Sequence, residues 1–352
     1  MGDEALLAII VARLRARFPY VEIEVLSEAP ELTAHELRVD ATPRGDLGAI
    51  RRAINRADIV LSGGGGLLQD ATSLRSLVYY AGIIRSAIKA HKATAIFSQS
   101  IGPLEAPGRL IVKECCKGLA AATVRDQRSV ELLQPLLSIP VTRTADPVFL
   151  YEEEPPPPGL EWLDAGDQPL VVVCVRKAPK FDAAALQIAA AVDRLSEQYG
   201  ARVAFLPIGG TGDAEASTIV IRRCRTRPML VGGGETLAIT AAVLRRACAV
   251  IGMRLHALIL AVRFGVPFLA VSYDPKVTSL CEDIAYPLPA LWTSPNQRSK
   301  ASAPRPAEAL VDQLWEQRAL LRTRLQAAGM EMRALAERNF DVVESLIDKG
   351  RK

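Results

Sequence analysis

The segment AVIGMRLHALILAVRFGVPFLAVSY, residues 249–273, contains two apolar runs rich in Val, Ile and Leu with a helical pattern between them. A strand, a covering helix and a second strand in this order form one unit of a parallel sheet. We therefore expect strands at Ala249–Met253 and Phe268–Tyr273, joined by a helix. This segment predicts an α/β fold.

The same alternation extends through most of the chain and ends near Tyr273. The strands expected in the first half are Val21–Ser27, Ala57–Ser62, Ala93–Ser98, Ala122–Asp126 and Val141–Ala145. The others expected in the second half are Leu170–Arg176, Arg202–Ile208 and Met229–Val231. Two helices, about Ala307–Ala327 and Met330–Asp348, are expected to finish the chain. The pattern indicates two parallel sheets covered by helices.

An acidic, proline-rich run, Glu152-Glu-Glu-Pro-Pro-Pro-Pro-Gly159, separates the two sets of strands. Consecutive prolines continue neither a helix nor a central strand, so this run reads as a stiff linker. The chain of 352 residues also exceeds the roughly 250–300 residues that one hydrophobic core usually serves. We expect Rossmann-like domains at 1–151 and 167–305, a linker at 152–166 and C-terminal helices at 306–352.

The opening residues Gly2-Asp-Glu-Ala-Leu-Leu7 read as a helix start, because acidic side chains in a first turn face the positive end of the helix dipole. A doubly wound domain normally feeds such a helix from a central strand. We therefore expect the first domain to lack its first strand.

Composition excludes several classes of protein. The formal net charge is only +4, and basic residues are interspersed with acidic ones, so nucleic-acid binding is not expected. The six cysteines contain no C-x-x-C pair, which argues against a zinc site or a disulfide framework. No leader opens the sequence, and no apolar run approaches the roughly 20 residues that span a bilayer. A cytoplasmic location without a bound metal is expected.

Small polar residues and glycines follow the expected strands of the first half. Ala57–Ser62 leads into Gly63, Gly64, Gly65 and Gly66 and then to Asp70, while Ser100 follows Ala93–Ser98. Ligands of open α/β sheets bind beyond the carboxyl ends of the strands. A loop of bare backbone there can approach a phosphate or sugar closely, although glycines can equally serve a tight turn.

Basic side chains follow the expected strands of the second half. Arg176 ends one strand, and a buried strand that ends in a guanidinium needs an anion or an acid beside it. Arg254 and His256 flank the start of a helix, which is an arrangement that binds anions. Lys276 lies just past the last strand. The alternative to an anion-binding role for Arg176 is an interdomain salt bridge.

These motifs together resemble the polysaccharide pyruvyltransferase family, particularly its CsaB-like branch, which modifies secondary cell-wall polymers. The matching pieces are GDEALL (2–7), SGGGGLLQD (62–70), SQSIGP (98–103), VRD (124–126), TADPVF (144–149), GMRLHALI (252–259) and YDPKV (273–277). They span nearly the whole chain in consistent order. The family usually has a strand and a glycine-rich turn ahead of GDEA, which this sequence lacks.

The resemblance implies a GT-B-like fold, with two Rossmann-like domains facing a central cleft. It also implies transfer of a pyruvyl group from phosphoenolpyruvate, with no further cofactor, to a sugar of a cell-surface polysaccharide precursor. Arg254, Leu255 and His256 match the family's R-L-H motif, and Arg176 resembles its second anion-binding arginine. Lys276 adds a third charge to this donor site. In the CsaB-like branch the acceptor is lipid-linked, so the enzyme reaches the inner face of the membrane.

The reaction needs an acid for the donor and a base for the sugar hydroxyl. His256 is the candidate acid, because an imidazole titrates near neutral pH. Asp3 and Asp70 are the candidate bases by their positions. Two other readings stay open: a GT-B-type glycosyltransferase that uses nucleotide sugars, and a non-catalytic sugar-binding module. The helix Ala5–Phe18 is either a core helix or an aid to membrane contact.

Overall fold

The computed structural model describes residues 3–71, 73–164, 166–232, 236–295 and 305–350, with only the backbone of Asp3 included. The chain divides into two compact units. Unit 1 consists of Met1–Ala5 and Tyr151–Glu331, and unit 2 consists of Leu6–Leu150 and Met332–Lys352. Each unit is an α/β structure with its own parallel sheet, as the sequence predicts.

Unit 1 is built on a six-stranded sheet with the strand order β12-β11-β10-β7-β8-β9. Every pairing in it is parallel. Its strands are β7 (Leu170–Cys174), β8 (Arg202–Phe205), β9 (Met229–Leu230), β10 (Ala249–Gly252), β11 (Phe268–Ser272) and β12 (Trp292–Thr293). Its helices include α7 (Phe181–Tyr199), α8 (Thr211–Ile221), α9 (Leu237–Arg246), α10 (Leu255–Phe264) and α11 (Pro275–Asp283).

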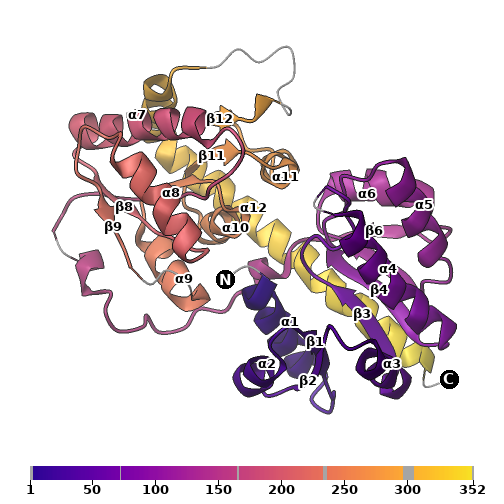
Figure 1. Ribbon diagram of the computed structural model, residues 1–352. Helices are drawn as coiled ribbons and strands as arrows, with labels where there is room; N and C mark the ends of the chain where they lie inside the picture. Colours follow the sequence, from indigo (N-terminus) through magenta and orange to yellow (C-terminus); the bar gives the residue numbers. More distant parts are fainter. Residues whose placement is uncertain (1–2, 72, 165, 233–235, 296–304, 351–352) are drawn as a thin grey trace. The chain divides into compact units, whose positions relative to one another are not determined.

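The central strand β7 is buried on both faces. Val171 and Val173 belong to a core cluster that also contains residues of α7 and of the C-terminal helix. Val172 and Cys174 are fully buried too, and strand alternation turns them to the opposite face. Helices cover both faces of the sheet (Figure 1). An uninterrupted apolar run is what such a strand requires.

Unit 2 contains a four-stranded parallel sheet, ordered β3-β4-β5-β6, and a separate parallel pair, β1-β2. Its strands are β1 (Glu24–Ser27), β2 (Asp40–Pro43), β3 (Ile59–Gly63), β4 (Ala93–Gln99), β5 (Ala121–Val124) and β6 (Val141–Arg143). Its helices include α1 (Asp3–Arg17), α2 (Pro30–Leu37), α3 (Leu47–Arg56), α4 (Leu74–Lys89), α5 (Ala106–Cys115) and α6 (Gln127–Leu133). β1 and β3 contribute Leu26 and Val60 to one cluster with α3 and α4.

All ten strands predicted from the sequence are present, although most are shorter than expected. Two further strands were missed. β2 has the sequence DATP with one buried residue, and β12 is two residues long, so neither presents an apolar run.

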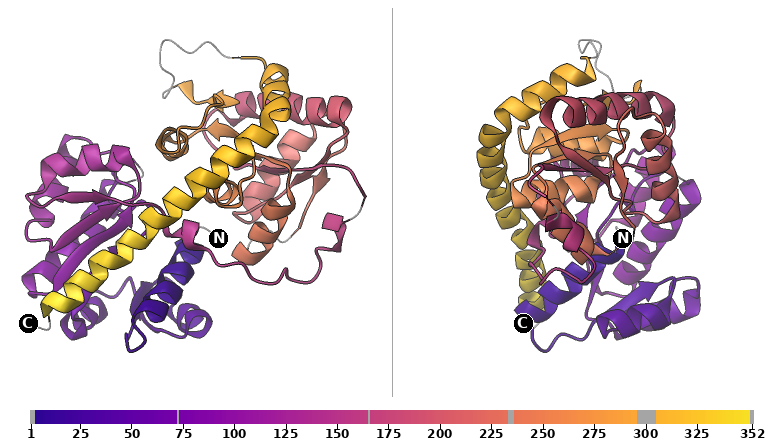
Figure 2. Two further views of the ribbon diagram at one scale, coloured as in Figure 1. Left: turned by 180° about the vertical axis from the view of Figure 1, so that it is seen from behind. Right: turned by 90° about the vertical axis from the view of Figure 1, so that its left-hand side faces the viewer.

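The C-terminal helical region differs from the prediction of two helices. It forms one helix, α12 (Ala307–Gly350), and not two (Figure 2). Gly329, where a break was expected, lies inside it and is buried. A Cβ atom at Gly329 would lie 2.8 Å from the carbonyl oxygen of Val262 in α10. The glycine therefore permits close packing of two helices and does not end one.

A buried polar network fixes the last part of α12 in unit 2. Oδ1 of Asn339 accepts hydrogen bonds from the hydroxyls of Thr123 and Thr144, at 2.7 and 2.8 Å. Its Nδ2 donates to the carbonyl oxygen of Ala145 at 3.0 Å. All of these residues are buried, so the network matches polar groups that water does not reach.

We expect Asn339→Ala to lower the free energy of unfolding by about 1–3 kcal/mol, because two buried hydroxyls lose an acceptor. Urea unfolding followed by circular dichroism measures the change. Arg338→Ala is the matched control, since this neighbouring side chain is exposed. Equal unfolding midpoints for the two variants would show that the network adds nothing to stability.

Helix α1 is a core helix of unit 2. Its apolar residues Leu6, Ile9 and Leu14 are buried. The arginines near its end pair with the chain itself: Arg13 with Glu337 and Arg17 with Glu344, both on α12. These contacts agree with the prediction that this helix belongs to the core.

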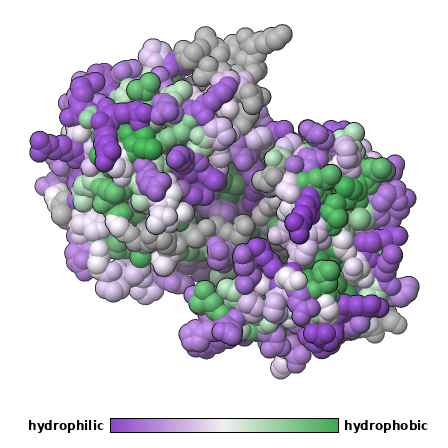
Figure 3. Space-filling view, in the orientation of Figure 1, coloured by the Kyte–Doolittle hydropathy of each residue, from purple (hydrophilic) through white to green (hydrophobic). Residues whose placement is uncertain are grey.

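Hydrophilic residues cover much of the face in Figure 3, with apolar patches between them. Among the described residues, no helix is long and apolar enough to cross a membrane.

Candidate anion-binding site at the strand ends of unit 1

The sheet register brings the predicted arginines to one edge of unit 1. Gly252 of β10 pairs with Cys174 of β7. Arg254 and Arg176 each follow these paired residues by two positions, so both lie beyond the carboxyl ends of neighbouring strands. The adjacent strands β8 and β11 end at the same edge because the whole sheet is parallel.

Arg176 is held by an aromatic residue from the next strand but one. Its Nη1 donates to the Tyr273 hydroxyl at 2.9 Å, and its Cζ lies 5.2 Å from the centre of the Tyr273 ring. Both side chains are half-buried. Burial raises the pKa of Tyr273, and the guanidinium groups of Arg176 and Arg254 oppose this rise. The phenol therefore stays neutral at physiological pH and adds no negative charge beside Arg176.

Arg254 is held by a buried carboxylate from α8. Its Nε donates to Oδ2 of Asp213 at 2.7 Å, and its Nη2 donates to Oδ1 at 2.5 Å. Asp213 is 3% exposed at the side chain, and its Oδ2 also accepts from the backbone N–H of Gly209 at 2.8 Å. In this contact the side chain of Arg254, which follows β10, passes the end of β7 and reaches the segment after β8. Nη1 has no hydrogen-bond partner within the described part of the chain.

His256 and Leu255 lie in the first turn of α10, directly after Arg254. Arg254 is the N-cap residue, and its side chain does not cap the helix. The first backbone N–H groups of α10 lie at the edge where both arginines lie. A helix start of this kind attracts anions through its N–H groups and its dipole. His256 is half-buried there.

Lys276 lies in the first turn of α11, which follows β11 at the same edge. Asp274 caps this helix, since its carboxylate accepts from the backbone N–H of Lys276 at 2.9 Å. The lysine side chain is half-buried. The four predicted donor-site residues, together with His256, thus lie at the strand ends of one sheet.

The glycine loop of unit 2 is folded against its own sheet. Gly64 and Gly65 have positive φ angles of 64° and 67°. The N–H of Gly64 donates to Phe97, and the carbonyl of Gly65 accepts from Ser100, both at 2.8 Å. A Cβ atom at Gly64 would lie 2.6 Å from Leu6 of α1. These two glycines serve a tight turn, whereas Gly63 is exposed with open space around it.

Asp70 lies between β3 and α4, and its carboxylate contacts the start of α5. Its Oδ2 accepts from the backbone N–H of Glu105 at 2.8 Å, and a Cβ atom at Gly108 would lie 2.3 Å from the same oxygen. The carboxylate therefore has a capping contact through one oxygen. The backbone of Asp3 begins α1, and its side chain lies outside the described residues.

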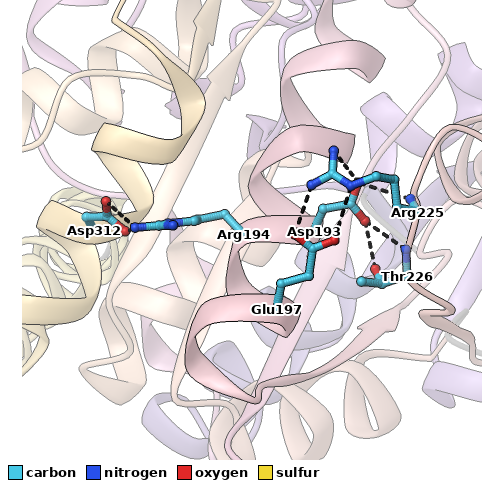
Figure 4. Close-up of polar contacts among 6 residues, drawn as sticks. All are labelled: Asp193, Arg194, Glu197, Arg225, Thr226 and Asp312. Atoms are coloured by element: carbon cyan, nitrogen blue, oxygen red, sulfur yellow. Dashed lines mark hydrogen bonds and ion pairs between the residues drawn. The ribbon is translucent and has the colours of Figure 1, made fainter.

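The arginine-rich stretch after α8 has structural partners. Arg223 pairs with Asp182, and Arg225 pairs with Glu197 at 2.9 Å. Beside them Asp193, which is 2% exposed, accepts hydrogen bonds from the backbone N–H groups of Arg225 and Thr226 (Figure 4). Burial alone would raise the pKa of Asp193, but these hydrogen bonds lower it overall. The cluster ties a loop to α7.

All six cysteines are free thiols, and Cys116 and Cys174 are buried. Burial raises the pKa of Cys116 to about 12, so this thiol stays protonated. In the residues that the structure describes, no group of three His, Cys, Asp or Glu side chains is placed to hold a metal ion.

The family of the chain follows from a comparison with protein-family models. The model described as polysaccharide pyruvyl transferase matches residues 1–275. The chain belongs to this family. No curated protein matches the sequence significantly.

Solved structures similar to this pyruvyl transferase family member show its fold. A candidate UDP-N-acetylglucosamine 2-epimerase from Listeria monocytogenes matches with a TM-score of 0.67 and 14% identity, over 99% of this chain and 95% of that one. HepE from Anabaena, in complex with UDP and glucose, matches at 0.59 and 14%, over 100% and 95%. UDP-GlcNAc 2-epimerase from Neisseria meningitidis matches at 0.60 and 10%, over 99% and 98%. The fold is α/β with parallel sheets, similar to GT-B glycosyltransferases and UDP-GlcNAc 2-epimerases.

Three residues at the strand ends of this family member were not predicted from the sequence. Asp213 and Gly209 belong to the run Gly209-Gly-Thr-Gly-Asp213, which directly follows the predicted strand at Arg202–Ile208. This run could have been recognised as a candidate site because it is rich in glycine and follows a strand end. Tyr273 was noted within YDPKV without a role, and only the structure shows its contact with Arg176.

Proposed function

We propose that this protein moves a pyruvyl group from phosphoenolpyruvate to a sugar of a cell-surface polysaccharide precursor. The product is a pyruvate ketal, and inorganic phosphate is released. Family membership supports a transferase of this kind. The observation that carries the proposal is the pair of arginines at neighbouring strand ends, with His256 two residues beyond one of them.

The charges at this edge suit a small dianion. Phosphoenolpyruvate carries a carboxylate and a phosphate, and guanidinium groups bind both with matched geometry. Arg176 contributes a guanidinium bonded to a phenol, and Arg254, the N-cap residue of α10, contributes the N–H groups that Asp213 does not bond. Lys276 supplies a further positive charge from α11. Leu255 contributes its backbone N–H.

In the proposed reaction His256 gives a proton to the methylene carbon of the donor, which becomes a methyl group. The adjacent carbon becomes electrophilic, and a sugar hydroxyl attacks it while losing its proton to a base. The bond from this carbon to the phosphate oxygen then breaks, and phosphate leaves with the proton that the base took from the first hydroxyl. A second hydroxyl of the sugar closes the ketal, and its proton balances the one that His256 supplied.

We retain Asp3 and Asp70 as the proposed bases. Asp70 uses Oδ2 for its cap, and Oδ1 has no partner among the residues described. The exposed backbone at Gly63 and the neighbouring Gly66 and Ser100 are proposed to contact the acceptor or a phosphate. For a lipid-linked acceptor, the enzyme would work in the cytoplasm at the inner membrane surface.

Calorimetry with phosphoenolpyruvate and with UDP-sugars tests the donor. We expect phosphoenolpyruvate to bind and UDP-sugars to show no saturable binding. The alternative is a nucleotide-sugar glycosyltransferase, which the fold of HepE with UDP and glucose favours. Saturable binding of a UDP-sugar, together with no response to phosphoenolpyruvate, would replace the proposal by this alternative.

We expect Tyr273→Phe to weaken phosphoenolpyruvate binding roughly twofold to tenfold, because Arg176 loses one hydrogen bond and keeps its ring contact. Calorimetry measures the dissociation constant. Tyr199→Phe is the control, since this hydroxyl bonds to Asp312 of α12. Unchanged donor affinity in Tyr273→Phe would show that the phenol does not position Arg176.

A further inference from the structure

We propose that Gly209 and Asp213 form a clamp that holds the Arg254 guanidinium in its donor-binding position. This inference rests on the proposed function, because it assigns positioning residues to the same donor site. The clamp consists of these two residues, at the end of the loop after β8 and in the first turn of α8. Neither residue was predicted from the sequence, and neither is proposed to touch the donor.

The carboxylate half of the clamp engages two of the three guanidinium nitrogens. Nε and Nη2 of Arg254 bond to the two oxygens of Asp213, so the plane of the guanidinium is fixed. The Gly209 N–H bonds to the same carboxylate at 2.8 Å and fixes it in turn. An arginine side chain otherwise loses considerable rotamer entropy when a ligand orders it. The clamp supplies this order before the donor binds.

The glycine half of the clamp makes room for the guanidinium. A Cβ atom at Gly209 would lie 1.9 Å from Nη2 of Arg254, which no structure tolerates. Gly209 has no positive φ angle, so alanine is compatible with its backbone. The nearest clashing group is the far end of the flexible Arg254 side chain, and the same Cβ atom would lie 2.9 Å from Oδ2 of Asp213. Gly209→Ala should therefore keep the fold and displace Arg254, without changing any charge.

The clamp also pairs the positive charge of Arg254 with the negative charge of Asp213. A buried carboxylate bonded to a guanidinium cancels most of its charge, so Arg254 acts mainly through the direction of its remaining N–H groups. Arg176, which faces a neutral phenol, keeps its charge. The two arginines therefore bind the donor in different ways, and for Arg254 the position of the guanidinium contributes more to binding than its charge does.

The test compares Gly209→Ala with Gly212→Ala in the full-length protein. Gly212 lies in the same loop-to-helix segment, and a Cβ atom there meets nothing within 4 Å. We expect Gly209→Ala to raise the dissociation constant for phosphoenolpyruvate on the order of tenfold, or about 1.4 kcal/mol. Gly212→Ala should bind as the parent protein does. Equal affinities in the two variants would overturn the clamp.

A second measurement works without the donor. Phenylglyoxal modifies accessible arginines, and mass spectrometry reports the rate at Arg254 with Arg176 as the internal reference. We expect faster modification of Arg254 in Gly209→Ala and an unchanged rate in Gly212→Ala. If the parent protein does not bind phosphoenolpyruvate, the proposed donor fails while this rate still decides the clamp. An unchanged rate at Arg254 in Gly209→Ala contradicts it.

Substitutions of Asp213 separate position from charge. Asp213→Asn and Asp213→Ala lose the same charge, but only Asn keeps an oxygen for Nε of Arg254. We expect Asp213→Ala to bind phosphoenolpyruvate more weakly than Asp213→Asn does, and equal affinities would count against positioning. Asp193→Asn is the matched control, because it alters an equally buried carboxylate with structural partners. It should lower thermal stability and leave donor affinity unchanged.

Discussion

Arg254→Ala should weaken phosphoenolpyruvate binding by roughly a hundredfold or more and should also destabilise unit 1 by about 3–5 kcal/mol. The first effect follows because the guanidinium N–H groups that are proposed to bind the anion are lost. The second follows because Asp213, 3% exposed at its side chain, loses the cation that its two oxygens bond. An unpaired negative charge would then repel an anionic donor at the same edge. Calorimetry and urea unfolding measure the two effects.

The double variant Arg254→Ala with Asp213→Asn separates stability from binding. Asparagine removes the unpaired charge, so much of the lost stability should return. Donor affinity should stay low, because no guanidinium is restored at this position. Normal binding of phosphoenolpyruvate by Arg254→Ala would show that this arginine serves only as the partner of Asp213.

His256→Ala should bind phosphoenolpyruvate with nearly normal affinity and should lose about 10²–10⁴-fold in turnover. His256 lies in the first turn of α10, two residues after Arg254, which is proposed to bind the anion. Its proposed contribution is the proton for the methylene carbon and not the anchoring of the anion. The measurement is phosphate release under saturating donor, together with calorimetry for affinity.

His35→Ala is the matched control for this variant. His35 is exposed on α2 in unit 2, so its removal should change neither affinity nor turnover. If His256→Ala kept full turnover, another group would have to supply the proton. If it lost donor binding instead, His256 would belong to the anion site.

The fold could be predicted from the sequence where apolar periodicity carried the signal. The runs around Val172 and Val250 are buried on both faces, and such runs leave little choice but a parallel strand. Short strands such as β2 and β12 gave no such run. The expected break at Gly329 was wrong because a glycine in a helix also allows close packing, here against Val262.

The site was predictable in part for the same reason. Strand-end rules located Arg176, Arg254 and His256, because each follows a recognisable apolar run. Partners that come from other parts of the chain were not predictable. Asp213 lies 41 positions before Arg254, and Tyr273 lies 97 positions after Arg176. Only the parallel order of β8, β7, β10 and β11 brings these pairs together.

The most direct measurement is incubation of the protein with phosphoenolpyruvate and a series of disaccharide-lipid acceptors. Phosphate release and the mass of the glycan are followed together. Pyruvyl transfer with His256 as the proton donor predicts one phosphate released for each ketal formed, and neither product with His256→Ala. Transfer of a sugar from a nucleotide sugar, with no phosphate released from phosphoenolpyruvate under any acceptor, would contradict it.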